Sequence, residues 1–89
     1  MHAVVVRVTI NDFELGRKFL TEQVVPRVKQ APGFVAGYWS TSEDNSNGLS
    51  MVVFESEDAA RAAAELVPQM VSESVTLENV EVRQVVANV

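Results

Sequence analysis

Cysteine is absent from this chain of 89 residues, and its absence excludes disulfide bonds, thiolate nucleophiles and metal sites with thiol ligands. Histidine occurs only once, as His2, which we expect to lie exposed at a frayed terminus. The single histidine and the acidic residues are not clustered at the spacing of metal ligands. The sequence also contains no glycine-rich loop that could hold a phosphate. The sequence therefore predicts no metal site and no cofactor.

Positive charge is also scarce, with 7 Lys and Arg against 12 Asp and Glu, for a formal net charge of -5. Such a chain repels a phosphate backbone, so we expect no nucleic-acid partner. Arg7 breaks the apolar run Val4–Val6, and no stretch approaches the ~20 residues of a membrane span. Met1 leads into a strand-like segment without the basic start of a signal peptide. We expect a cytoplasmic protein with no membrane partner.

The chain does have a clear order of hydrophobic patterns. Alternating and helical patterns follow one another as β-α-β-β-α-β, with alternation over Ala3–Ile10, Phe34–Thr41, Leu49–Phe54 and Val80–Val86. This is the order of the ferredoxin-like fold. We predict an α+β protein in which residues 1–89 form one domain. Its four-stranded antiparallel sheet should carry two helices on one face.

The first strand has two apolar faces. Every second residue from Val4 to Ile10 is β-branched, and this face should pack against the helices. The other face is largely apolar too, but it carries Arg7. Two helices can cover only one side of a sheet, and a small domain tolerates little exposed apolar surface. We therefore predict a homodimer formed through the sheet face.

The first helix should begin at Asn11, whose side chain can cap the free amides while Glu14 reaches back in a capping box. Pro26 lies inside the helical pattern and lacks the N–H that would bond to the Glu22 carbonyl. We expect a kink there. Pro32–Gly33 should end the helix.

The second and third strands should form a hairpin, because a wholly polar segment that ends in Asn47–Gly48 joins them. We expect its tip to be mobile. Ser56 should cap the second helix, and Pro68 should end or bend it. The buried stripe of that helix consists mostly of small residues, namely Ala59, Ala63, Leu66 and Met70.

Two short motifs within this frame carry a family resemblance. Pro32-Gly33-Phe34 joins the first helix to the second strand, and Phe54-Glu55-Ser56 leads into Ala59-Ala60. In this order the chain resembles the dimeric α+β-barrel superfamily, specifically the antibiotic-biosynthesis-monooxygenase-like group. The resemblance implies a homodimer whose two sheets face each other, with a cavity between each sheet and its helices or loops. Members of the group include cofactor-free oxygenases of aromatic polyketides, haem-degrading enzymes and proteins with no demonstrated activity.

The haem-degrading branch does not fit. Members of this branch have a Trp at the position that corresponds to Phe54. They have an iron-ligating His where this chain has the run Ala62–Ala64. Their first-strand Asn falls near Arg7. Because none of these positions matches, we expect no haem degradation.

Four residues are candidates for the cavity: Arg7, Tyr38, Trp39 and Phe54. Arg7 could pair with an anionic ligand, and the aromatic residues could wall a dry pocket. Tyr38 and Trp39 point to opposite faces of a strand, so only one can face the barrel. We favour Trp39, because Gly37 and Thr41 beside it leave space.

Each candidate also has a structural interpretation, in which Arg7 pairs with Glu81 and the aromatic residues fill core. Two functions therefore stay open. One is a small dimeric α+β-barrel protein that binds a small apolar or aromatic molecule in a cavity by the sheet. The other is a cofactor-free monooxygenase acting on an aromatic or polyketide-like substrate, in which the deprotonated substrate supplies the electrons.

Overall fold

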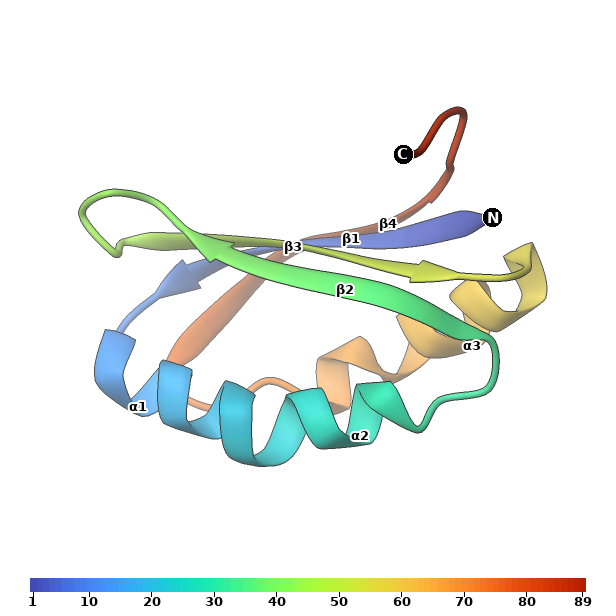
Figure 1. Cartoon of the computed structure of the whole chain (residues 1–89). Coiled ribbons are helices and arrows are strands. Elements are labelled where there is room, and N and C mark those ends of the chain that lie inside the picture. Colours follow the sequence, from blue (N-terminus) through green and yellow to red (C-terminus); the bar gives the residue numbers. More distant parts are fainter.

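The computed structural model describes residues 1–89, and its four strands form one antiparallel sheet in the order β2-β3-β1-β4. Both helical segments lie on the same face of this sheet (Figure 1). The ferredoxin-like fold predicted from the sequence is thus confirmed. In chain order the elements are β1 His2–Ile10, α1 Phe13–Phe19, η1 Leu20–Val24, α2 Val25–Lys29, β2 Phe34–Thr41, β3 Asn47–Phe54, α3 Glu57–Leu66, η2 Val67–Gln69 and β4 Val75–Gln84.

Asp12, and not Asn11, caps the first helix. The Asp12 carboxylate accepts a hydrogen bond from the Leu15 N–H at 3.1 Å. The backbone N–H groups of Asn11 and Asp12 both donate to the Ser74 carbonyl, at 2.8 and 3.1 Å. The Asn11 side chain donates to the Thr76 hydroxyl at 3.0 Å. The long-range contacts of Asn11 thus place the start of the helix one residue later than predicted.

Pro26 produces a wide turn in a helix that continues through it. The segment η1 is a π-helix, in which the Val25 N–H donates to the Leu20 carbonyl. This five-residue step lets the chain pass Pro26, which has no N–H to donate. Figure 1 shows α1, η1 and α2 as one continuous helical segment. The expected kink therefore takes the form of a π turn.

The two motifs that carry the family resemblance lie against each other. Gly33 has a φ of +79°, and a Cβ there would lie 3.0 Å from the Ala59 Cβ. Its carbonyl accepts a hydrogen bond from the Glu55 N–H at 2.8 Å. Only glycine adopts this conformation readily and leaves room for Ala59. The start of β2 is thereby joined to the start of α3.

The turn of the β2–β3 hairpin ends before Asn47–Gly48, which the sequence indicated as part of the connecting segment. Asn47 is already the first residue of β3. The residue with positive φ is Asn45, at 59°. The Asp44 carboxylate accepts hydrogen bonds from the hydroxyls of Ser42 and Ser46, at 2.8 and 2.6 Å. These bonds lower the pKa of Asp44, the Ser46 hydroxyl most of all. The tip that was expected to be mobile is thus held by a local network.

The second helix, α3, begins as predicted, with the Ser56 hydroxyl accepting a hydrogen bond from the Ala59 N–H at 3.1 Å. Its small side chains let it approach β1, β3 and β4 closely. Ala60 is fully buried under it. The buried core beneath α3 and α2 comprises Val4, Val28, Val52, Phe54 and Ala60.

The last strand starts earlier and ends earlier than the sequence indicated. β4 begins at Val75 and ends at Gln84, so Val86 lies beyond it and is 90% exposed. Its register against β1 shifts between Arg7 and Val8. This bulge interrupts the two-residue alternation of apolar residues. The sequence pattern therefore did not reveal the first half of the strand.

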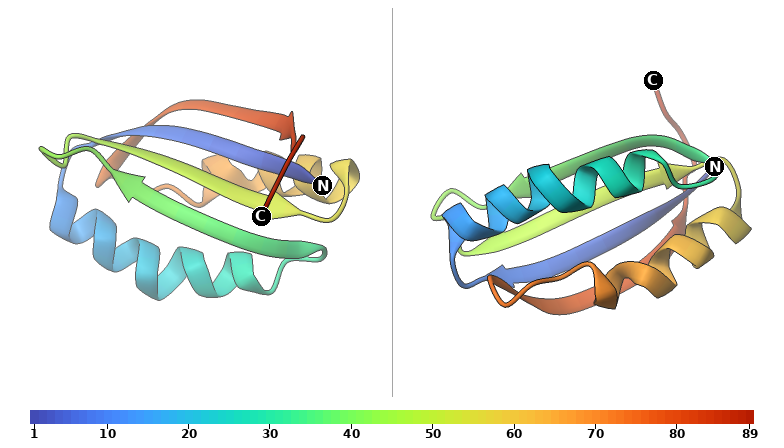
Figure 2. Two further views of the ribbon diagram at one scale, coloured as in Figure 1. Left: turned by 45° about the horizontal axis from the view of Figure 1, so that its top comes forward. Right: turned by 90° about the horizontal axis from the view of Figure 1, so that it is seen from below.

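The sheet face opposite the helices is uncovered and partly apolar. Leu49 and Met51 are 47% and 46% exposed there, and Val5 lies beside Met51. The segment after β4 rises from this face, as Figures 1 and 2 show. No helix of the structure is long and apolar enough to cross a membrane.

Candidate functional site

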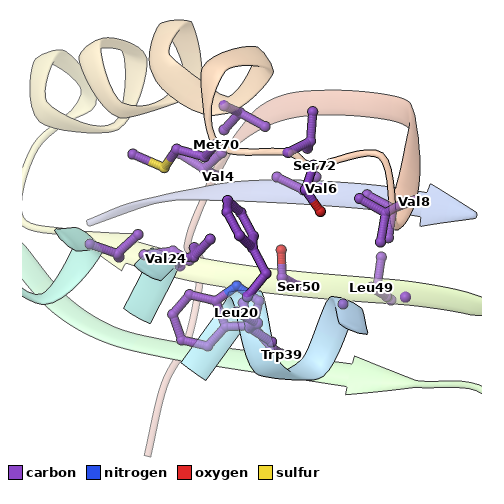
Figure 3. Close-up of a pocket in the computed structure, with 18 of the residues that line it drawn as sticks. Val4, Val6, Val8, Leu20, Val24, Trp39, Leu49, Ser50, Met70 and Ser72 are labelled. Carbon is purple, nitrogen blue, oxygen red and sulfur yellow. The ribbon is translucent and has the colours of Figure 1, made fainter. Parts of the chain in front are cut away.

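A pocket of about 340 Å³ lies between the inner face of the sheet and the helical layer (Figure 3). It exists because α3 approaches the sheet closely, whereas the first helical segment approaches no strand to the same degree. Figure 2 (right) shows the two helical segments over different parts of the sheet, with β3 and β1 visible between them. Most of the lining is hydrophobic, including Val4, Val6, Val8, Leu20, Val24 and Met70.

The pocket floor is formed by rows of residues that cross the sheet. In one row Trp39 of β2 pairs with Ser50 of β3, and Ser50 pairs with Val6 of β1. In the next row Val52 lies between Gly37 and Val4. Side chains in such rows share one face, so Trp39 and Ser50 are neighbours in an otherwise aliphatic floor.

The structure places Trp39 in the pocket and Tyr38 on the opposite face, where Tyr38 is 71% exposed. The Trp39 ring lies over Gly37, because a Cβ on Gly37 would lie 2.9 Å from two carbons of that ring. Any side chain at this position would displace the indole. Gly37 therefore fixes how the aromatic ring forms part of the pocket wall.

Phe54 lines the pocket from the end of β3 and is only 1% exposed. Its ring meets that of Phe34 edge to face, with centroids 6.4 Å apart and an interplanar angle of 79°. Such a pair is a favourable aromatic arrangement. Phe54 thus belongs both to the pocket wall and to the core.

Arg7 is not among the residues that line this pocket, and it lies exposed on the open face of the sheet. Its neighbours across the strands there are Leu49 and Asn79. The alternative pairing with Glu81 does not occur, because Glu81 accepts a 2.7 Å hydrogen bond from Arg83 on its own strand. The structure thus brings together Trp39 and Phe54, and separates them from Arg7 and Tyr38.

The polar groups of the pocket are few, and they are mostly hydroxyls. Ser72 and Ser74 share a hydrogen bond with each other, in the loop that leads to β4. The Ser50 hydroxyl points into the pocket (Figure 3). The one charged lining residue is Arg17, whose side chain is 59% exposed and paired with Glu14. The pocket interior therefore offers hydrogen-bond donors but neither a carboxylate nor an imidazole as a base.

These serines were not identified from the sequence. The inner-face residues of β3 are Gly48, Ser50, Val52 and Phe54, so Ser50 is the one hydroxyl on that face of the strand. A lone hydroxyl in an apolar row was a usable signal. Ser72 and Ser74 gave none, because they lie in a loop whose position depends on the start of α1.

His2 is not at a frayed terminus, since it is the first residue of β1 and is partly buried. Its Nδ1 is buried and has no hydrogen-bond partner. Nearby, hydrogen bonds and charge from Arg61 lower the pKa of Glu57, with a smaller effect from His2. His2 does not line the pocket, and no group of three or more His, Asp or Glu residues is placed to hold a metal ion.

No protein-family model and no curated protein matches the chain. Among solved structures it is similar to a monooxygenase from the gene ActVA-Orf6 of Streptomyces coelicolor, in complex with nanaomycin D. That match has 20% identity and a TM-score of 0.68, and covers 99% of this chain and 89% of that chain. It is also similar to SnoaB, a cofactor-independent oxygenase from Streptomyces nogalater, at 19% identity and a TM-score of 0.72, covering 98% and 97%. At these identities the two structures confirm the ferredoxin-like fold that the sequence predicted.

Proposed function

We propose that this protein binds a small, largely apolar or aromatic molecule in the pocket between its sheet and its helices. The observation that carries the proposal is the pocket itself, which has about 340 Å³ and a mostly hydrophobic lining. Binding pockets for small molecules start at about this size and have apolar walls with a few polar groups. Trp39 and Phe54 are the aromatic walls of this site.

Ligand binding can be measured through the single tryptophan, because Trp39 lies in the pocket. A bicyclic hydrocarbon such as tetralin should change its fluorescence and raise the melting temperature, as any ligand of the native state does. Val24→Phe should fill the pocket and abolish both effects. Gln23→Phe adds the same ring to an exposed neighbour and should preserve both. Unchanged binding by Val24→Phe would place the ligand elsewhere.

A second function, cofactor-free monooxygenation of an aromatic or polyketide-like substrate, is supported by the similarity to two monooxygenase structures. In that reaction the substrate supplies the electrons, so that an activated CH₂ group and O₂ give a carbonyl group and water. The pocket offers hydrogen-bond donors to a substrate oxygen, but no carboxylate or imidazole that could remove a proton from the substrate. A substrate would therefore have to ionise readily by itself.

An oxygen electrode tests this second function. Protein-dependent oxygen uptake with polycyclic phenols, above the rate of their autoxidation, would support a monooxygenase. The Val24→Phe variant should then lose the activity together with binding. Binding of the phenols without any added oxygen uptake would leave ligand binding as the function.

We further propose that the protein forms a homodimer through the open face of the sheet. Leu49, Met51 and Tyr38 expose apolar surface there, and soluble monomers rarely leave large apolar patches uncovered. The chain after β4 rises from the same face, with Val86 almost wholly exposed (Figure 2). A second copy of the chain would cover both features.

Sedimentation velocity at micromolar concentration should give a dimer. Met51→Lys, which puts a charge in the centre of the open face, should give a monomer, whereas Lys29→Met on the helical side should not change the mass. A monomeric wild-type protein would contradict the proposal.

The cytoplasmic location expected from the sequence also stays a proposal. It is supported by a chain without cysteine, which gains nothing from an oxidising compartment. Fractionation of the cells that make the protein should recover it with the cytoplasmic markers.

A further inference from the structure

Two residues of the pocket floor that are directly opposed across β2 and β3 each have a hydrogen-bond donor, the hydroxyl of Ser50 and the indole N–H of Trp39. We propose that these two groups bind one carbonyl oxygen of the ligand, so that the site selects an uncharged cyclic ketone over a hydrocarbon of the same shape and over a carboxylate. The inference rests on the proposed ligand-binding function and adds to it the class of ligand and the two residues that select it.

The sheet sets the positions of both donors. Trp39 and Ser50 are directly opposed in the β2–β3 register, which places their Cβ atoms about 5 Å apart on the pocket side. The Trp39 ring is confined by its contact with Gly37. The Ser50 hydroxyl points into the pocket (Figure 3). Both donors therefore belong to the rigid sheet and not to the helical layer.

Neither donor has a partner within the chain, whereas the other hydroxyls of the lining do. Ser72 and Ser74 bond to each other, and Ser40 donates to the Leu49 carbonyl at 2.7 Å. Neither donor is sealed from water in the empty pocket, because His2 Nδ1 is the one buried side-chain polar atom without a partner. A ligand that expels this water leaves both donors unpaired unless it brings an acceptor, and this cost selects a ligand with a carbonyl oxygen. A carbonyl oxygen has two lone pairs and can accept from both groups at once.

The charge of the pocket favours a neutral ligand. The only ionised lining residue, Arg17, lies at the exposed rim and is already paired with Glu14. A carboxylate bound beside Ser50 would lose its water and gain no counter-ion within the pocket, which is costly. A ketone loses much less on desolvation and keeps its acceptor oxygen.

Three probes of similar size test the inference with the wild-type protein: 1-tetralone, its hydrocarbon analogue tetralin, and 1-naphthoate. Calorimetry should show tetralone binding about fivefold or more tightly than tetralin, as one or more net hydrogen bonds provide. Naphthoate should bind more weakly than either. The single indole N–H resonance should move downfield with tetralone and not with tetralin. Equal binding of tetralone and tetralin would overturn the inference.

Two variants assign the selectivity to its residues. Ser50→Ala should weaken tetralone binding about fivefold and leave tetralin binding within twofold. Trp39→Phe keeps an aromatic ring without the N–H and should act in the same way. Tyr38→Phe removes a hydroxyl from the opposite face next to Trp39 in the chain, and it should change neither affinity.

The outcomes separate this inference from the function on which it rests. If neither tetralin nor tetralone binds, the proposed function fails. If both bind and Ser50→Ala weakens them equally, or weakens neither, the pocket is a binding site but the donor pair does not select the ligand. Loss of the difference between the two probes in the Ser50→Ala, Trp39→Phe double variant, with thermal melting still cooperative, would support the inference.

Discussion

The two helical segments cover the same face of the sheet in different ways. α3 has five alanines in ten residues, buries Ala60 completely and lies close to three strands. The first segment carries large apolar residues such as Phe19 and Leu20, yet neither α1 nor η1 contains a buried residue. The half with the smaller side chains is therefore the better packed one.

The comparison shows how a cavity arises in a small protein. Small side chains let a helix descend until backbone and sheet nearly touch, whereas large ones hold it away. If large side chains do not fill the space that they create, the lining loses contacts and a pocket remains. Natural proteins accept such losses of stability where a site requires them. In this molecule the pocket lies between the two helical segments, since Ala63, Leu66 and Met70 line it together with residues of the first segment.

The largest expected effect is a loss of stability when a large side chain is truncated in the better-packed half. Phe54→Ala should lower the free energy of unfolding by about 3–5 kcal/mol, because Phe54 is buried against Phe34 and the base of α3. Leu20→Ala, on the π turn beside the pocket, should cost about 1–2 kcal/mol, since that side chain is partly exposed. Urea unfolding measures both. Similar losses would mean that the two halves are packed equally well.

An intermediate effect is expected when side chains are enlarged. Ala60→Leu forces extra atoms beneath α3 and should cost about 1–3 kcal/mol. Val24→Leu extends into the pocket and should change stability by no more than about 0.5 kcal/mol. Ala62→Leu, on the exposed side of α3, controls for helix propensity. A large loss for Val24→Leu would show that the pocket has no room for added atoms.

The better-packed half was also the half that the sequence predicted more fully. Ser56 caps α3 because a local hydrogen bond to Ala59 is enough. The predicted buried stripe is right for Ala59 and Ala63 but wrong for Leu66, which is 47% exposed, and it missed the fully buried Ala60. In the first segment Asn11 and Asp12 are both good caps, and contacts with the distant Ser74 decide between them. A cap that depends on a hydrogen bond between near neighbours could be predicted from the sequence. A cap that depends on contacts with distant residues could not.

The same limit applies to the site. Alternation predicted that Arg7 lies on the face of the first strand away from the helices and that Tyr38 and Trp39 point to opposite faces, as the structure has them. The sequence could not locate the cavity, because its position depends on how far a helix stands from the sheet. Arg7 therefore drew attention as a charge on an apolar face, while the pocket formed on the other side, around Ser50.

The smallest expected effect concerns charge at the start of the well-packed half. Glu57 and Arg61 lie one turn apart on α3, with 2.6 Å between carboxylate and guanidinium. The hydrogen bond and the charge of Arg61 lower the pKa of Glu57 below the ordinary value of a glutamate. A carboxyl with a lower pKa in the folded state stabilises the fold above its unfolded value, and this contribution disappears as the pH falls through the folded pKa.

Glu57→Gln should therefore melt slightly below the wild type at pH 7. The gap should begin to close below about pH 4.5 and vanish once the pH is below the folded pKa. Because both side chains are largely exposed, the gap should be small and should shrink in high salt. Glu65→Gln removes an unpaired charge from the same helix and serves as the control. A gap that stayed constant from pH 7 to pH 3 would mean that Glu57 acts through packing, so that even the edge of this half depends on close contact and not on charge.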